Sequence, residues 1–299
     1  MKNIPSGSCM SILEENTQVK LKNKNNWIYG YANNVTSQAG ENGMIAKVFD
    51  VIGISNKYCV ELGAGDGKYY SNVWPLIANE GWSSLLIESE LRWFDKLHTE
   101  HFGRSGVQCL NEQVTIDGQN SLDSIFKRSG VPKNFDLLSI DIDGADWHLW
   151  HSLKFFNPRL VVIEFNPTIP SNVDFVQAAD CEIQQGSSLR AMIRLAKEKG
   201  YEFIGATWLN AFFVLKDYLQ LFKIEDNSIS SMGFNVIGDQ VFYLYDGTIV
   251  KTGSMMLPWQ NIPLDIEDIQ VLPKYERYFR AGRVRKAVLP ASLKNQESN

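Results

Sequence analysis

The chain has few cysteines, no excess of basic residues and no long apolar segment, and each absence narrows the possible classes of protein. Its cysteines, Cys9, Cys59, Cys109 and Cys181, are far apart and form no Cys-x-x-Cys pair, which favours buried free thiols over disulfides. The net charge of −5 argues against a broad surface for nucleic acid. No run of about 18 apolar residues occurs, and the polar N-terminus lacks a secretion signal, so we expect a cytoplasmic protein without a membrane partner.

The residues that are present favour a large α/β domain. Of the 299 residues, 44% are hydrophobic and 12% aromatic, which is enough for a sizeable core in one large domain with appendages, or in two small ones. We predict strands at 58–62, 84–88, 107–110, 136–141, 159–165, 201–206 and 210–215. We predict helices at 41–52, 70–79, 90–99, 121–129, 145–154 and 188–199. Strands that alternate with helices of this length imply a mostly parallel sheet covered on both sides.

The regions outside this alternation differ in composition. Residues 1–40 are rich in Asn, Lys and Ser and weakly patterned, so we predict an N-terminal arm before a domain at 41–217. Residues 218–299 form a predicted extension, in which the turn dipeptide Asp246-Gly247 separates two β-rich runs and indicates a hairpin. The extension ends in a basic tail, where a solvated surface and a patch for an anionic ligand both remain open.

The most informative segment is the run that begins at Tyr58. It ends in three glycines at alternate positions, Gly63, Gly65 and Gly67, with Glu61 just before the first. A buried strand that ends in such a turn lets the backbone come close to a ligand, because glycine has no Cβ. A second apolar run ends in Glu88, 21 residues beyond Gly67, about the spacing at which an acid binds a ribose hydroxyl in nucleotide-type folds. Together these features predict a nucleoside-binding domain.

A second set of polar residues follows two later strands. Asp141 and Asp143 end one predicted strand, and Glu164 and Asn166 end the next. In open α/β sheets the carboxyl ends of the strands form the ligand-binding edge, and Asp141 and Asp143 share one side, with Cα atoms about 6.6 Å apart at strand rise. Carboxylate and amide oxygens are the ligands that hard divalent cations prefer. We therefore predict a metal site formed by these four residues if the strands are neighbours.

Other polar residues near this edge have competing interpretations. Asp146 is better explained as a cap or loop anchor that accepts backbone N–H groups. His148 is a candidate general base, because its pKa suits proton transfer near neutrality, although a simply packed histidine is the commoner case. Our candidate catalytic residues are therefore Asp141, Asp143 and His148.

The ordered set of motifs resembles the class I S-adenosylmethionine-dependent methyltransferases, and within them the FkbM-like group. The matching pieces are Glu61–Gly67, Leu86–Glu88, Leu138–Gly144, Val161–Asn166 and a lead-in segment at Ser37–Gly43. The resemblance covers about residues 37 to 215, and the ordered set is considerably more specific than the glycine motif alone.

The resemblance implies a Rossmann-like, seven-stranded, mostly parallel sheet flanked by helices, with a reversed final hairpin and a C-terminal hairpin-containing extension. S-adenosylmethionine would lie over the three glycines. Glu88 would hold the ribose hydroxyls, Glu61 would lie near the amino-acid end, and Asn111 would approach the adenine. The acid-lined turn would oppose a phosphate, as of a dinucleotide, but suits a cationic sulfonium.

The resemblance also implies a chemistry, O-methylation of a small molecule or glycan with Mg or Mn as a possible aid. The four metal candidates are similar to the site of catechol-type O-methyltransferases, but Phe165 separates Glu164 from Asn166 where those enzymes have an adjacent acid and amide. Two other interpretations stay open. One is an NAD-type oxidoreductase, which the Gly-x-Gly-x-Gly spacing disfavours, and the other is a non-catalytic nucleoside-binding module. The acceptor and any homo-oligomer are left open, and nucleic acid is the least favoured partner.

Overall fold

The computed structural model describes residues 27–232, 240–244, 246–252, 256–257, 262–263 and 265–277. The chain divides into two compact units, the first comprising Met1–Gly238 with Pro258–Asn261 and the second comprising Asp239–Leu257 with Ile262–Asn299. The sequence places the change near residue 217, whereas the first unit continues to Gly238. This continuation includes the 3-10 helix η3 (Lys216–Phe222), whose residue Phe222 is buried in the core of the first unit.

The first unit contains a seven-stranded sheet. Its strands are β1 (Tyr58–Leu62), β2 (Ser83–Glu88), β3 (Val107–Asn111), β4 (Leu137–Ile140), β5 (Leu160–Glu164), β6 (Tyr201–Ala206) and β7 (Asn210–Leu215). They lie in the order β3-β2-β1-β4-β5-β7-β6, and β7 is antiparallel to both of its neighbours while the other pairs are parallel. The predicted α/β sheet with a reversed final hairpin is confirmed, and its strand bounds are within one residue of the prediction.

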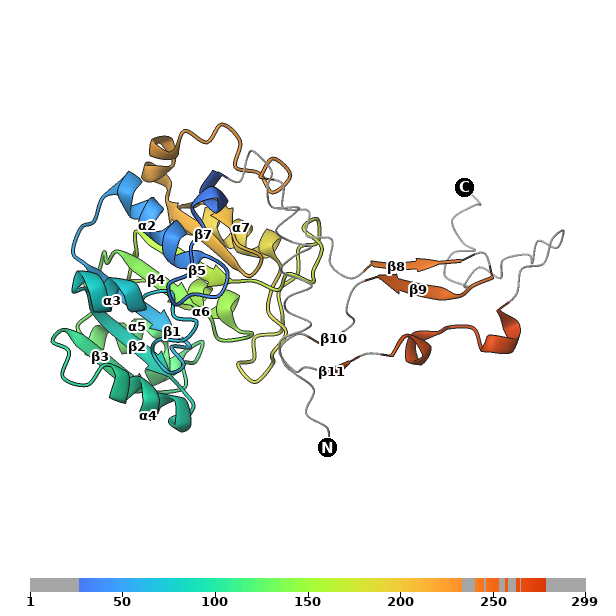
Figure 1. The fold of residues 1–299 in the computed structure, drawn as a ribbon, viewed down its shortest axis with the longest axis horizontal. Helices are drawn as coiled ribbons and strands as arrows, with labels where there is room; N and C mark the ends of the chain where they lie inside the picture. The colour runs from blue at the N-terminus through green and yellow to red at the C-terminus, as the bar shows by residue number, and fades with distance from the viewer. Residues whose placement is uncertain are drawn as a thin grey trace. The chain divides into compact units, whose positions relative to one another are not determined.

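Helices cover both faces of this sheet (Figure 1). One face packs against α2 (Glu41–Ile52), α3 (Trp74–Glu80) and α4 (Leu91–Glu100). The other packs against α5 (Leu122–Arg128), α6 (Asp146–Ser152) and α7 (Leu189–Glu198). Because successive strand side chains point to opposite faces, Leu138 of β4 belongs to the second core and its neighbour Leu137 to the first. This two-sided burial explains why the strands are almost continuously apolar.

The segment after the glycine turn differs from the predicted helix. The sequence predicts a helix at 70–79, but α3 begins only at Trp74, with Pro75 in its first turn. Pro suits the first helical position because it lacks the N–H that would be unpaired there. The residues before it form a separate loop, since Ser71 and Asn72 hydrogen-bond to Glu61 instead of continuing a helix.

The sheet order places the two informative motifs side by side. The chain runs from β1 outward through β2 to β3, then returns to β4 on the other side of β1. Ligands bind at such a switch point in open α/β sheets, beyond the carboxyl ends of the strands. Here those ends lead directly into Gly63 and Asp141, which touch through the backbone, since a side chain at Gly63 would overlap the carbonyl oxygen of Asp141.

The predicted N-terminal arm is only partly described. Within it, Ile28 of the turn η1 (Trp27–Tyr31) is fully buried in the core beside α2. Asn42 accepts hydrogen bonds from the backbone N–H groups of Val35, Thr36 and Ser37. The part of the arm that the structure describes is therefore packed on the domain. Three of the cysteines are free thiols, as predicted, but only Cys59 is buried, while Cys109 and Cys181 are partly exposed. Cys9 lies outside the described residues.

The second unit contains the predicted hairpin. Strands β8 (Gln240–Tyr243) and β9 (Ile249–Thr252) pair antiparallel. The side-chain amide of Gln270 bonds to both the N–H and the C=O of Ile249. The short pair β10 (Met256–Leu257) and β11 (Ile262–Pro263) follows, with the turns η4 (Ile266–Ile269) and η5 (Lys274–Glu276). Most of the basic tail lies outside the described residues. Among the helices that are described, none has the length and apolar character to cross a membrane.

Candidate functional site

The three glycines of the turn after β1 share a backbone conformation but differ in their surroundings. All have positive φ, 70° at Gly63, 54° at Gly65 and 80° at Gly67, a region that L-residues rarely adopt. Gly63 lies against the backbone of Asp141, and a Cβ at Gly67 would be 2.6 Å from Leu97 and 2.9 Å from His101. Gly65 instead faces open space, because a Cβ added there would have no atom of the described residues within 4 Å. Gly65 is therefore the glycine over which a ligand can lie.

Glu88, at the end of β2, reaches across to this turn. Its carboxylate accepts hydrogen bonds from the N–H of Gly65, at 2.9 Å, and from the N–H of Glu90, at 2.8 Å. Glu88 therefore lies beside the glycine turn and is bonded to its backbone. Asn111 lies next to it, but its amide donates to the carbonyl oxygens of Glu88 and Ser89. Asn111 therefore braces the end of β2 in this structure.

Glu61 holds the loop that follows the turn. It is buried, and its carboxylate accepts hydrogen bonds from the Ser71 hydroxyl and the Asn72 N–H, both at 2.7 Å. Asn72 in turn donates to the Ser139 hydroxyl on β4. Burial raises the pKa of Glu61 to about 7, although these hydrogen bonds offset part of the effect. Glu61 is therefore an anchor at the carboxyl edge of the sheet that becomes protonated near neutrality.

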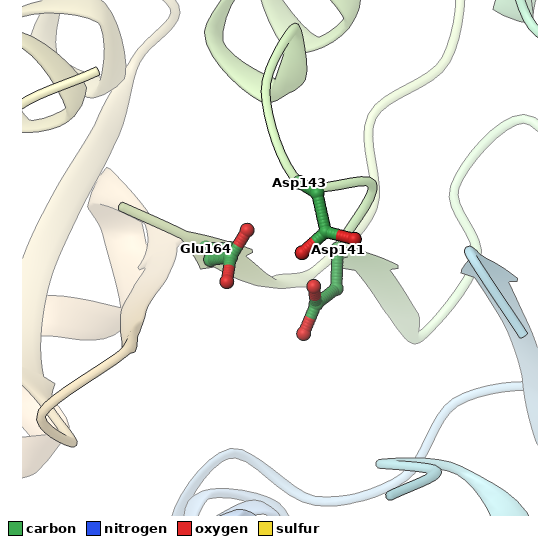
Figure 2. Close-up of side chains that lie close together, drawn as sticks. All are labelled: Asp141, Asp143 and Glu164. Carbon is green, nitrogen blue, oxygen red and sulfur yellow. The ribbon is translucent and has the colours of Figure 1, made fainter. Parts of the chain in front are cut away.

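Three carboxylates gather at the ends of β4 and β5. Asp141 and Asp143 follow β4, Glu164 ends β5, and one oxygen of each lies within 4.8 Å of the other two (Figure 2). The parallel pairing of β4 with β5 produces this arrangement, because it brings both carboxyl ends to one edge. Asp143 has a φ of 61°, a left-handed conformation that Asp tolerates at a cost of about 1 kcal/mol. The loop thus holds Asp143, one of the three carboxylates, in a backbone conformation that aspartate does not favour.

The electrostatics of this group are strongly negative. Burial raises the pKa of Asp141 well above its ordinary range, and the charged groups that raise it further are all carboxyls, Asp146, Asp143, Glu41 and Glu61. Partial loss of solvent and the charge of Glu88 also raise the pKa of Asp143. Ionised carboxyls this close together repel one another, and a positive ligand among them would relieve that repulsion.

Asp146 has the anchoring role predicted for it. Its carboxylate accepts hydrogen bonds from the backbone N–H groups of Ile142 and Gly144, both at 3.0 Å. These bonds close the loop between β4 and α6 and fix the backbone on both sides of Asp143. Burial raises the pKa of Asp146 to about 6, with the hydrogen bonds acting in the opposite direction.

Two predicted site residues have other partners. The side-chain oxygen of Asn166 accepts hydrogen bonds from the N–H and the hydroxyl of Thr168, and its amide donates to Gln185. Both lone pairs of that oxygen are used, so Asn166 is not arranged as a fourth metal ligand here.

His148, the candidate base, also has a partner. Its Nε2 lies 2.8 Å from the carbonyl oxygen of Gln177, to which it must donate a hydrogen bond, so only Nδ1 is left to accept a proton.

Two buried residues at the same edge were not predicted. Glu41, at the start of α2, accepts hydrogen bonds from the Thr207 hydroxyl and the Asn210 amide, and Asn210 pairs with Glu164 across β7 and β5. His101, at the end of α4, lies with Nε2 3.0 Å from the carbonyl oxygen of Gly67. The contact of Glu41 with Thr207 spans 166 residues, so no local motif reveals it.

Comparisons with known proteins give likeness of fold only. No family model and no curated protein matches this chain. Among solved structures, an S-adenosylmethionine-dependent methyltransferase from Aquifex aeolicus matches at 12% identity over 57% of this chain and 89% of that one, with a TM-score of 0.36. Another such methyltransferase, from Clostridium acetobutylicum, matches at 6% identity over 70% of this chain and 99% of that one, with a TM-score of 0.37. Identities and TM-scores this low do not establish a shared family.

Proposed function

We propose that this chain is an S-adenosylmethionine-dependent methyltransferase that methylates a hydroxyl group. One observation carries the proposal: a glycine turn with open space at Gly65 lies directly beside a group of mutually repelling carboxyls, at the switch point of the sheet. The turn lets a ligand come close to the backbone, and the carboxyls favour a ligand that carries positive charge.

The charge at this edge discriminates between cofactors. S-adenosylmethionine carries a sulfonium and an ammonium group, which fixed carboxylates attract. A nicotinamide dinucleotide carries a pyrophosphate, which they repel, and the interaction between close charges at a partly buried site is worth about 4 kcal/mol in either direction. The negative edge therefore disfavours the dinucleotide-dependent oxidoreductase. A non-catalytic nucleoside-binding module would have no use for the strained position of Asp143.

The bound cofactor would use the residues of the turn. Adenosine would lie over Gly65, with its ribose hydroxyls at Glu88, which already points to that turn. Asn111 would border the adenine, and Glu61 the amino-acid end. The oxygen of the acceptor would attack the methyl carbon in line as the carbon–sulfur bond breaks, and the electron pair would go to sulfur. The protein mainly aligns the three reacting atoms.

The proton of the acceptor hydroxyl must go to a base. Asp141 is our candidate, because its raised pKa makes its carboxylate a stronger base than an ordinary aspartate. Asp143 would support it. His148 is the weaker candidate, since its Nε2 already donates to Gln177.

A divalent ion would fit the same group of acids. Asp141, Asp143 and Glu164 offer three oxygens within 4.8 Å, the donor type that Mg²⁺ and Mn²⁺ prefer. When bound, such an ion would lower the pKa of an acceptor hydroxyl. Asn166 would join only by giving up its bonds to Thr168.

Calorimetric titration with S-adenosylmethionine and with NAD⁺ tests the cofactor. We expect the first to bind and the second not to. Gly65→Asn should abolish binding, because Asn tolerates positive φ and its side chain would fill the open space. Gly130→Asn is the matched control, since Gly130 also has positive φ, 71°, and a Cβ there would have no described atom within 4 Å. Binding of NAD⁺ in place of S-adenosylmethionine would overturn the proposal.

The reaction and its metal need a separate assay. Incubation with candidate alcohols, phenols and glycosides should give a product that is one methylene unit heavier, detected by mass spectrometry. We expect chelation to suppress turnover and Mg²⁺ or Mn²⁺ to restore it, and Asp141→Asn to abolish it. Full turnover of Asp141→Asn in chelator would refute both the base and the metal role.

A further inference from the structure

Two exposed tyrosines stand next to each other in the loop between the glycine turn and α3. The side chains of Tyr69 and Tyr70 are 67% and 48% exposed. Their ring centroids are 4.0 Å apart with an interplanar angle of 37°, and their hydroxyls lie 3.0 Å apart, within hydrogen-bonding distance. Two neighbouring rings that pack on each other at the surface expose more apolar area together than one singly exposed aromatic residue does.

The loop that carries them is held rigidly. At its start, the Asp66 carboxylate accepts the N–H groups of Lys68 and Tyr69, at 3.0 and 2.7 Å. At its end, Ser71 and the residue after it bond to the buried Glu61. The tyrosines are therefore presented by a pre-ordered loop, which lowers the entropy cost of binding to them.

Tyr70 is also strained. Its φ is 64°, a left-handed conformation that is a genuine outlier for a bulky residue, where Gly or Asn would avoid the cost. Most positions with positive φ in the described part of the chain are glycines, and Tyr70 is one of four exceptions, with Lys57, Asp143 and Lys223. Tyr70 thus keeps a half-exposed ring at this position in spite of a cost in backbone strain.

The pair lies at the same edge as the proposed site. Tyr70 directly precedes Ser71, whose hydroxyl is bonded to Glu61 at the end of β1, and the loop is tied to β4 through the bond of Asn72 to Ser139. The tyrosines thus border the edge on which the carboxylates of the proposed site stand. A molecule that reaches those carboxylates has a second contact available here.

We propose that Tyr69 and Tyr70 form a platform for a neutral sugar ring of the methyl acceptor, an inference that rests on the proposed methyltransferase function. One face of a sugar ring is rich in C–H groups and packs on an aromatic ring, while its other hydroxyls stay in water or meet the tyrosine hydroxyls. A flat aromatic acceptor gains more where both of its faces are buried, which an exposed platform does not offer. The carboxyls nearby disfavour phosphorylated or carboxylated acceptors.

Saturation-transfer NMR with methyl β-D-glucopyranoside, methyl β-D-galactopyranoside and methyl α-D-mannopyranoside tests the platform, with catechol as a competing probe. We expect transfer to ring C–H protons of at least one glycoside, and about a tenfold loss of affinity in Tyr69→Ala and in Tyr70→Ala, as for other aromatic stacking contacts. Tyr69→Phe should retain most of the binding because it keeps the ring. Phe155→Ala, which removes an exposed ring before β5, should change nothing.

Two further measurements separate the possible failures. S-adenosylmethionine affinity, measured by calorimetry, should be unchanged in the tyrosine variants. If the wild type does not bind S-adenosylmethionine, the proposed function fails regardless of the sugars. If it does bind and no glycoside binds, or catechol alone binds, the platform proposal is overturned. Tyr70→Asn should raise the melting temperature by removing strain while it weakens glycoside binding, and unchanged glycoside binding in this variant would also overturn the proposal.

Discussion

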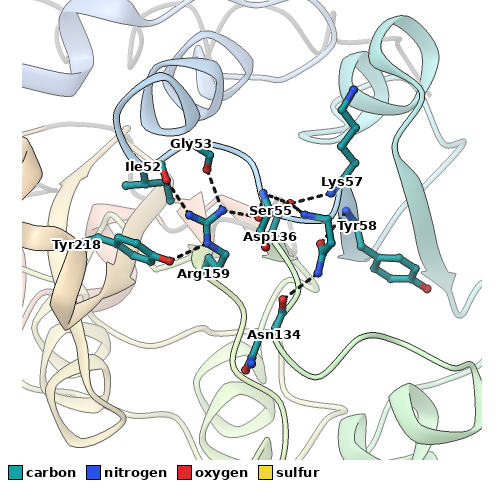
Figure 3. A network of polar contacts seen from close by, with 10 residues as sticks. Ile52, Gly53, Ser55, Lys57, Tyr58, Asn134, Asp136, Arg159 and Tyr218 are labelled. Carbon is teal, nitrogen blue, oxygen red and sulfur yellow. Dashed lines mark hydrogen bonds and ion pairs between the residues drawn. The ribbon is translucent and has the colours of Figure 1, made fainter.

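Asp136 and Asp141 flank the same strand, β4, and their surroundings are opposite. Asp136, before the strand, is fully buried and ion-paired with Arg159 at 2.6 Å (Figure 3). It also accepts hydrogen bonds from the backbone N–H groups of Ser55, Asn56 and Lys57. Asp141, after the strand, has charged neighbours that are further carboxyls. Each acid lies at one edge of the sheet, so the buried Asp136 and the partly buried Asp141 have contrasting charged surroundings.

The difference distinguishes an edge where a buried charge is paired within the fold from an edge where we propose that a ligand binds. Arg159 also donates to the carbonyl oxygens of Ile52 and Gly53 and to the hydroxyl of Tyr218. These bonds connect the end of α2 and the 3-10 helix η3 to the amino edge of the sheet. The charge of Asp136 is matched there within the fold. At the carboxyl edge, acids crowd around Asp141 and raise its pKa, a cost to stability that is explained if a positive ligand completes the site.

The largest expected effect comes from breaking the matched pair. Arg159→Met leaves Asp136 buried without its counter-ion, so we expect the free energy of unfolding to fall by about 3–5 kcal/mol. Urea denaturation measures this loss. Arg92→Met is the control, because Arg92 is 71% exposed in its ion pair with Glu90 and such pairs contribute about 0–1 kcal/mol. A loss below about 1 kcal/mol in Arg159→Met would mean that the amino edge does not depend on this pair.

A smaller effect is expected from removing a charge at the carboxyl edge. Glu61 has a pKa of about 7 in the folded chain against an ordinary value of 4.5. Between these values the folded state binds more protons than the unfolded state, so stability falls as pH rises from 4.5 to 7, by up to the order of 3 kcal/mol from this group. Glu61→Gln should not show this fall in stability with pH, because glutamine does not ionise. The variant also lacks the carboxylate oxygen that accepts the hydrogen bond of Ser71.

Urea denaturation of wild type and Glu61→Gln at several pH values between 4.5 and 8 isolates the contribution as a difference. Glu225→Gln, at an exposed position, serves as the control. Parallel pH profiles for wild type and Glu61→Gln would show that Glu61 keeps an ordinary pKa. The same reasoning gives the opposite sign for the ligand: affinity for a cation should rise with pH over this range, because binding favours the ionised carboxyls.

The sequence reveals these two edges unequally. Asp141 and the glycine turn are visible because a run of apolar residues ends in acids or glycines, which few buried strands do for packing alone. Asp136 stands at the start of the same apolar run, and its role depends on Arg159 and on the loop after α2, which only the fold brings together. The prediction of a helix from residue 70 was wrong for a related reason. The apolar residues there have helical spacing, but Ser71 forms a hydrogen bond to Glu61, which the sequence does not reveal.

The smallest expected effect tests whether strain at the carboxyl edge serves ligand binding. Asp143 has a φ of 61°, so Asp143→Gly should raise the free energy of unfolding by about 1 kcal/mol, because glycine adopts this conformation without a Cβ clash. Lys223→Gly is the matched control, since Lys223 has a φ of 55° at an exposed position and should gain a similar amount. Thermal denaturation with and without Mg²⁺ then separates the two positions. Wild type and Lys223→Gly should be stabilised by the ion and Asp143→Gly should not, because binding to the folded state alone raises stability. If Asp143→Gly instead loses stability, its carboxylate has a structural role like that of Asp136, and the contrast between the two edges is weaker than their charges indicate.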